Sequence, residues 1–228
     1  MLVASLVIFQ QMNSGFTGVT IGTPDGKVNL VSLPDGSKVR LSAGSSITLA
    51  GTDTFERQLT LDGSAFFDVV PSDIRFEIET TNASVVVYGT SFGVTAATHS
   101  DITEVTLVSG SVSLSSANED DAVLLNPGEF SRVVGDSSPT EPQIVDLESA
   151  LSWSDLFVFR DTPLSQVAER LSERFELPIA VDEELLNRTV TGTFAPENGL
   201  RFILDAVAAA LNVRVETSDD NQVYSITS

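Results

Sequence analysis

Hydrophobic residues between about Val28 and Val134 occur in short runs that alternate with polar residues. The runs recur about every ten residues and are separated by turn-forming residues, a spacing typical of a sandwich, barrel or solenoid of short strands. Asp-Gly pairs separate several of these runs, at Asp25-Gly26, Asp35-Gly36 and Asp62-Gly63. Because this dipeptide supplies the positive φ of a tight turn, each pair predicts a turn between strands. The region is therefore predicted to be all-β, with sandwich and solenoid both open.

The periodicity changes after residues 135–142, a stretch rich in Ser, Pro and acidic residues. Seven apolar positions then repeat at an offset of 36 residues: Val158, Leu164, Val167, Ala168, Leu171, Phe175 and Ile179 match Phe194, Leu200, Ile203, Leu204, Val207, Leu211 and Val215. Within each set the spacing i, i+3, i+4, i+7 predicts an amphipathic helix flanked by strands.

The two predicted helices cover Leu164–Phe175 and Leu200–Leu211, with Thr162 and Asn198 as the expected N-caps, and a last strand covers Val223–Ile226. Neither strand–helix–strand unit can bury its apolar face alone, so the two are expected to pack as one small two-layer domain. The predicted fold class is mainly β plus α+β: an all-β domain followed by a βαβ-repeat domain.

Four segments follow from these patterns: residues 1–14, the all-β domain 15–135, a linker 136–152 and the α/β domain 153–228. Met1–Phe9 is almost entirely apolar, but it is shorter than the about 20 residues that a spanning helix needs. Three interpretations remain: the end of a membrane span that begins upstream, the apolar part of a leader peptide, or a buried strand. The first is favoured.

Charge and composition exclude several classes of function. The chain has 32 acidic and 12 basic residues, a formal net charge of -20, and a surface this negative repels nucleic-acid phosphates. The sequence contains no cysteine, which excludes disulfides, thiolate metal sites and cysteine nucleophiles. His99 is the single histidine and lies in a polar stretch that predicts a surface loop.

The acidic residues do not form a recognisable catalytic or metal-binding motif. Adjacent acids occur at 119–121, Glu183-Glu184 and Asp219-Asp220, mostly in predicted turns, and an oxygen-ligand cation site at 118–121 lacks EF-hand spacing. We therefore predict no catalytic, cofactor-binding or metal-binding residue and no enzymatic activity. Trp153, the single tryptophan, is expected to pack with nearby Leu and Phe residues between the domains, or to form a binding patch with them.

Five motifs follow one another in the β region: LPDGSKVRL at 33–41, RQLTLDGSAFFDV at 57–69, VYGTSFGV at 87–94, VTLVSGSV at 105–112 and LNPGE at 125–129. In their order and spacing they resemble the motifs of the FecR family. Trp153, Phe159, the stretch 161–164 and Thr191-Gly192-Thr193-Phe194 resemble the family's C-terminal domain. That domain is similar to the short signalling domain of secretins and TonB-dependent transducers. Ser64 departs from the pattern, because the family often has Glu there.

The resemblance implies a non-catalytic, periplasmic signal-receiving region, tethered to the inner membrane in the full-length protein. Its implied partner is the signalling domain of a TonB-dependent outer-membrane transducer that takes up iron complexes or glycans. An extracytoplasmic-function (ECF) sigma factor is the implied target of a cytoplasmic segment that this sequence lacks. No cofactor is implied.

Partner contact is predicted at the last strands, where an exposed sheet edge would accept a partner's strand. The residues expected near this edge are Val213, Val215, Val223, Tyr224 and Ile226; alternatively they only fill the core. A different class of function also remains open, a periplasmic or surface β-module that binds carbohydrate or acts as a scaffold.

Overall fold

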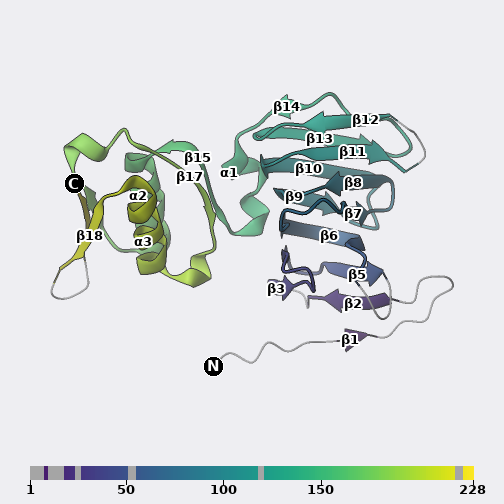
Figure 1. Ribbon diagram of the computed structural model, residues 1–228, viewed down its shortest axis with the longest axis horizontal. Helices are drawn as coiled ribbons and strands as arrows, with labels where there is room; N and C mark the ends of the chain where they lie inside the picture. Colours follow the sequence, from purple (N-terminus) through teal and green to yellow (C-terminus); the bar gives the residue numbers. More distant parts are fainter. Residues whose placement is uncertain (1–7, 10–17, 24–26, 51–54, 118–120, 219–222) are drawn as a thin grey trace. The chain divides into compact units, whose positions relative to one another are not determined.

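The computed structural model describes residues 8–9, 18–23, 27–50, 55–117, 121–218 and 223–228 (Figure 1). The chain divides into two compact units, Met1–Ser154 and Asp155–Ser228, which we call the β unit and the α/β unit. The predicted fold class is confirmed, because strands alone build the sheet of the first unit while the second combines helices with short strands.

The described residues of the β unit form one hydrogen-bonded network of 14 strands, in two half-sheets that share the long strand β6 (Gln58–Asp68). The start of β6 belongs to a half-sheet with β1 (Ile8–Phe9), β2 (Gly18–Gly22), β5 (Ser46–Ala50), β7 (Phe76–Glu79), β8 (Ala83–Val87), β11 (Val112–Ser116) and β12 (Ala122–Leu125). The end of β6 belongs to the other, with β3 (Asn29–Ser32), β4 (Lys38–Leu41), β9 (Ser91–Ala96), β10 (Ile102–Ser109), β13 (Glu129–Val134) and β14 (Gln143–Ile144).

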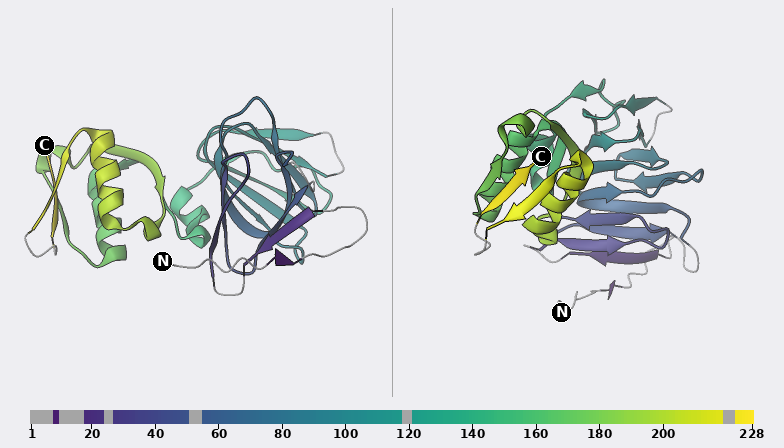
Figure 2. Two further views of the ribbon diagram at one scale, coloured as in Figure 1. Left: turned by 60° about the horizontal axis from the view of Figure 1, so that its bottom comes forward. Right: turned by 60° about the vertical axis from the view of Figure 1, so that its left-hand side comes forward.

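From β7 onward, successive pairs of strands alternate between the half-sheets: β7–β8 lie in the first, β9–β10 in the second, β11–β12 in the first and β13–β14 in the second. The strands consequently rise as a stack of rungs (Figure 1), and the sheet curls around a common interior (Figure 2). The unit therefore combines the facing sheets of a sandwich with the stacked winding of a solenoid.

The interior is filled by side chains that alternate along each strand. In β6, Leu59, Leu61, Ala65 and Phe67 are buried, at the two-residue spacing of one strand face. Phe67 stacks on Phe92 of β9 with 5.3 Å between the ring centroids. The core therefore connects both half-sheets.

Gly63 corrects one prediction from the sequence. Asp62-Gly63 is not a turn between strands but lies inside β6, where the strand passes from one half-sheet to the other. Gly63 has φ +99°, and Ser45 occupies the space that a Cβ would need. The glycine is thus required for a bend rather than a hairpin. Asp35-Gly36 does form the predicted turn, with φ +88° at Gly36, whereas Asp25-Gly26 lies outside the described residues.

The last residues of the β unit cover the outer face of the second half-sheet. Strand β14 is followed by helix α1 (Leu147–Ala150), Leu151 and the 3-10 helix η1 (Ser152–Ser154). We call these eight residues the covering segment. The covering segment lies over Gly93 of β9, where an added Cβ would meet Leu151 and approach Trp153 to 3.0 Å. The buried Arg40 of β4 donates from Nε to the carbonyl oxygen of Ser154 at 2.8 Å. Strand β14 and α1 come from the stretch predicted as a linker.

The helices of the α/β unit, α2 (Leu164–Phe175) and α3 (Leu200–Leu211), have the predicted bounds and the predicted offset of 36 residues. The strands are β15 (Phe157–Pro163), β16 (Ile179–Val181), β17 (Thr189–Phe194), β18 (Arg214–Thr217) and β19 (Tyr224–Thr227). They form two sheets, β15–β17 and β16–β19–β18. The helices lie between these sheets (Figures 1 and 2), so the unit has three layers rather than the two predicted.

The helix starts also differ from the prediction. Thr162 belongs to β15, paired with Val190, and Asn198 belongs to the short 3-10 helix η3 (Pro196–Asn198). The first amides of α2 donate to backbone carbonyls instead, Leu164 to Arg188 at 2.7 Å and Ser165 to Leu186 at 3.1 Å. A distant loop therefore satisfies the helix terminus, and no side-chain cap is needed.

Candidate functional site

The described residues contain no arrangement typical of an active site. His99 is exposed in the turn between β9 and β10, and Glu183 and Glu184 are exposed in the 3-10 helix η2 (Glu183–Leu185). No group of three or more His, Asp or Glu side chains within the described part of the chain is placed to hold a metal ion. The acids at 119–120 and 219–220 lie outside the described residues.

The three-stranded sheet of the α/β unit offers a more specific feature. Its order is β16–β19–β18, so β19 is central and β18 is an edge strand. Within the described residues β18 pairs only with β19, in antiparallel register from Arg214 opposite Thr227 to Thr217 opposite Tyr224. The backbone groups of β18 that face away from β19 are consequently available to a further strand.

The structure brings the five predicted partner-binding residues into one hairpin, but in different settings. Val215 lies on the edge strand, while Tyr224 and Ile226 lie on the central strand. Ile226 is 1% exposed and packs in the core, whereas Val223 is 40% exposed just before β19. Val213 precedes β18 and packs against the same core. Partner binding at these residues stays a prediction; only Val215 belongs to the strand with the open edge.

Two further residues, which the sequence pattern did not predict as partner-binding, also belong to this edge. Arg214 and Glu216 are exposed, because side chains alternate along β18 and Val215 faces the core between them. The alternation of charged and apolar residues in RVET predicts a strand with one exposed face. It does not predict that this strand lies at the edge of the sheet. A strand added at this edge would meet one positive and one negative side chain, and these would favour one register.

Helix α3 fixes the position of β18. Arg201 donates from Nε to Asp205 at 2.9 Å and from Nη1 to the hydroxyl of Thr217 at 3.0 Å. The hydrogen bond that Arg201 donates to Asp205, together with the negative charge of Asp205, raises the pKa of Arg201 above its ordinary value. At the other end, the amide of Val213 donates to the carbonyl of Ala208 at 3.0 Å. Both ends of the edge strand are therefore attached to the same helix.

No helix within the described ranges combines the length and the apolar character that crossing a bilayer requires. Of the N-terminal apolar stretch, the structure describes Ile8 and Phe9, which form β1 and pair with β2. Residues 1–7, on which the predicted membrane span depends, lie outside the described residues.

Comparisons with known proteins give family matches in both units. A family model described as FecR protein matches residues 19–113, and a second, described as FecR, C-terminal, matches residues 156–225. Two crystal structures of a "putative anti-sigma factor" from Parabacteroides distasonis ATCC 8503, at 1.65 and 2.50 Å, share the fold. Each has 24% identity and a TM-score of 0.54, and covers 91% of this chain and 97% of that chain. No curated protein matches significantly. The FecR model matches in the β unit and the FecR C-terminal model matches after it, in the α/β unit. The chain therefore belongs to the FecR family.

Proposed function

We propose that this chain is the periplasmic, signal-receiving region of a FecR-like regulator of a sigma factor. In this proposal the α/β unit binds the signalling domain of a TonB-dependent outer-membrane transducer through the open edge of β18. The observation that carries the proposal is this edge strand, which lies in the unit that matches the family's C-terminal model. The name of the Parabacteroides protein of similar fold supports the regulatory role.

Strand addition is the binding mode that suits β18. A partner strand would take up hydrogen bonds with backbone groups that have no strand beside them, and alternate side chains would give specificity. Val215 lies on the edge strand and Val213 directly before it, whereas Val223, Tyr224 and the buried Ile226 belong to or directly precede the central strand that supports this edge. No step of this binding requires a catalytic residue, a metal or a cofactor, in keeping with a regulator family.

The remaining parts of the proposal concern the full-length regulator. A membrane-anchored form would place both units in the periplasm and reach an ECF sigma factor through a separate cytoplasmic segment. The secretin- or TonB-like character of the α/β unit is part of this proposal, and its two helices between two small sheets fit it. The acidic charge of -20 disfavours nucleic acid as a direct ligand.

Isothermal titration calorimetry with the purified chain tests the proposal. The signalling domain of the transducer encoded beside this protein should bind, and Arg214→Glu should weaken binding about tenfold or more because it reverses a charge on β18 beside the added strand. Arg188→Glu is the matched control, since it makes the same charge change at an exposed residue outside this sheet. Failure to bind any such transducer domain, or equal weakening by both variants, would count against the proposal.

A further inference from the structure

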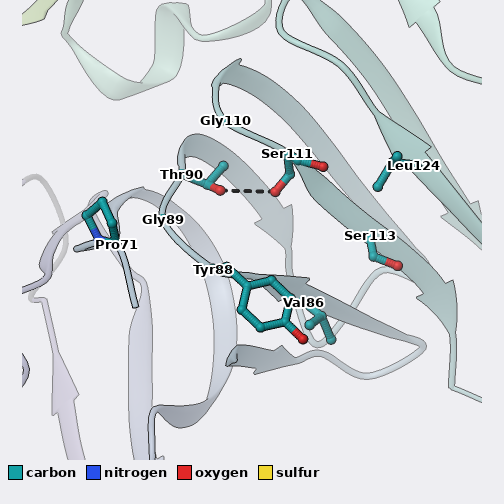
Figure 3. Close-up of a pocket in the computed structure, with 9 residues that line it drawn as sticks. All are labelled: Pro71, Val86, Tyr88, Gly89, Thr90, Gly110, Ser111, Ser113 and Leu124. Atoms are coloured by element: carbon teal, nitrogen blue, oxygen red, sulfur yellow. Dashed lines mark hydrogen bonds between the residues drawn. The ribbon is translucent and has the colours of Figure 1, made fainter. Parts of the chain in front are cut away.

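The outer face of the β unit contains a hollow of about 370 Å³ where β8, β11 and β12 lie side by side (Figure 3). It is lined chiefly by Pro71, Val86, Tyr88, Ser111, Ser113 and Leu124. A volume near the lower end of the about 300–1,000 Å³ range of small-molecule sites suits a small ligand rather than a protein segment.

Strand register produces the hollow. Val86 of β8, Ser113 of β11 and Leu124 of β12 are direct cross-strand neighbours on one face. The side chain of Ser113 is shorter than those of Val86 and Leu124 on either side of it. Strand β11 therefore forms the floor of the hollow, and these two larger side chains form its walls (Figure 3). The alternate residues of β11, Val112 and Leu114, are fully buried on the opposite face. The floor is therefore anchored in the core of the unit.

The end of the hollow beside Tyr88 is held by hydrogen bonds to backbone carbonyls. Ser72 donates its amide to the carbonyl of Tyr88 at 2.8 Å, and the hydroxyl of Thr90 donates to the carbonyl of Ser111 at 3.0 Å. Gly110 has φ +90°, and a Cβ there would lie 2.7 Å from the carbonyl oxygen of Gly89. The two turns that close this end touch each other, so the hollow exists without a ligand.

The chemical character of the lining is unusual for this chain. Tyr88 is 56% exposed and Leu124 62% exposed, yet none of the described residues that line the hollow is charged, although the protein carries a net charge of -20. The overall field disfavours anions, and a cation would find no carboxylate among the described lining residues. Among the described residues, no partner is present for the hydroxyls of Ser111 and Ser113. The site thus favours a neutral ligand that has an apolar face and hydroxyl groups.

We propose that this hollow binds a neutral saccharide of one or two sugar rings. The apolar face of a sugar ring packs on the exposed aromatic ring of Tyr88 and beside Leu124, and its hydroxyls exchange hydrogen bonds with Ser111 and Ser113. The β unit would then bind a glycan directly, in addition to the protein contact proposed for the α/β unit, and the two sites lie in different units.

The test is a titration of the full chain with maltose, cellobiose, lactose and gentiobiose, and a screen on an array of neutral glycans. Backbone amide resonances of residues 86–90 and 111–113 should shift in nuclear magnetic resonance spectra with at least one of these sugars. Tyr88→Ala should weaken that binding about tenfold or more, whereas Tyr88→Phe should largely keep it because the ring is retained. Ser113→Leu should abolish binding by filling the floor.

Ile144→Ala is the matched control, because it removes an exposed hydrophobic side chain, 88% accessible, from another edge strand of the same unit. Thermal melting shows whether each variant is folded. Absence of binding to every disaccharide and every array glycan overturns the proposal, as does equal binding by Tyr88→Ala and the unchanged protein. Tyr88→Ala should leave transducer binding intact in calorimetry, so the two proposals fail or succeed separately.

Discussion

Asp35 and Arg57 form an almost fully buried ion pair, with 3.1 Å between Asp35 Oδ2 and Arg57 Nη1. Their side chains are 12% and 8% exposed, and they come from two different motifs of the FecR pattern. Asp35 also accepts hydrogen bonds from the amide and hydroxyl of Ser37, at 3.0 and 2.8 Å. Arg57 donates from Nη2 to the carbonyl of Val70 at 2.9 Å. The pair therefore ties the turn before β4 to the start and the end of β6.

Removing one charge of this pair should be costly. Asp35→Asn should destabilise the protein by about 3 kcal/mol, because the guanidinium of Arg57 would stay buried without its counter-charge. Arg57→Met combined with Asp35→Asn should cost less than the sum of the single changes, since neither charge then remains unpaired. Urea unfolding measures all three variants.

The pair Arg75–Glu77 provides the control, because its arginine side chain is 64% accessible although that of Glu77 is only 17% accessible. Arg75→Met should cost less than about 1 kcal/mol, since it removes a charge that solvent already screens. If Asp35→Asn lowers the free energy of unfolding no more than Arg75→Met does, the buried pair does not have the stabilising role assigned to it.

Gly93 should be intolerant of even one methyl group. Gly93→Ala places a Cβ against Leu151. We therefore expect the free energy of unfolding to fall by about 1–3 kcal/mol, and hydrogen exchange in the covering segment to become faster. Gly22→Ala is the matched control, since Gly22 is also a strand glycine but its nearest neighbour would be at an ordinary 3.6 Å. Leu151→Ala should partly rescue Gly93→Ala. If both glycine variants unfold at the same temperature, the covering segment does not depend on Gly93.

The helix ends differ in strain although their geometry matches. Glu176 after α2 and Asn212 after α3 both have left-handed backbone, with φ 55° and 53°. Asparagine adopts this conformation readily but glutamate does not, so Glu176→Gly should stabilise the protein by about 1 kcal/mol. Asn212→Gly should change stability by only a few tenths of that amount. Calorimetric melting of the two variants checks this, and an equal effect would argue against strain at Glu176.

The two units were predictable from the sequence to different degrees. The apolar repeat predicted both helices to the residue, because burial on one helix face imposes its period on the sequence. The helix starts were mispredicted, since the amides of Leu164 and Ser165 are satisfied by carbonyls from a loop more than twenty residues away. At Gly63 the sequence correctly required positive φ, but only the pairing of β6 on both sides distinguishes a bend from a turn.

The candidate sites were harder to predict because both depend on neighbours in space. Val215 and Ile226 look alike in the sequence, yet one lies on an edge strand and the other on the central strand. Likewise, nothing in the sequence places Tyr88, Ser113 and Leu124 around one hollow; the pairing of β8, β11 and β12 does so.

Hydrogen–deuterium exchange of the free and transducer-bound chain is the most direct measure of strand addition at β18. Amides of Arg214–Thr217 should exchange more slowly in the complex, because an added strand takes up the outward-facing backbone groups of β18. Ile179–Val181, at the other edge of the same sheet, should be unaffected. A complex that leaves exchange in Arg214–Thr217 unchanged, or that protects Ile179–Val181 instead, would contradict strand addition at β18.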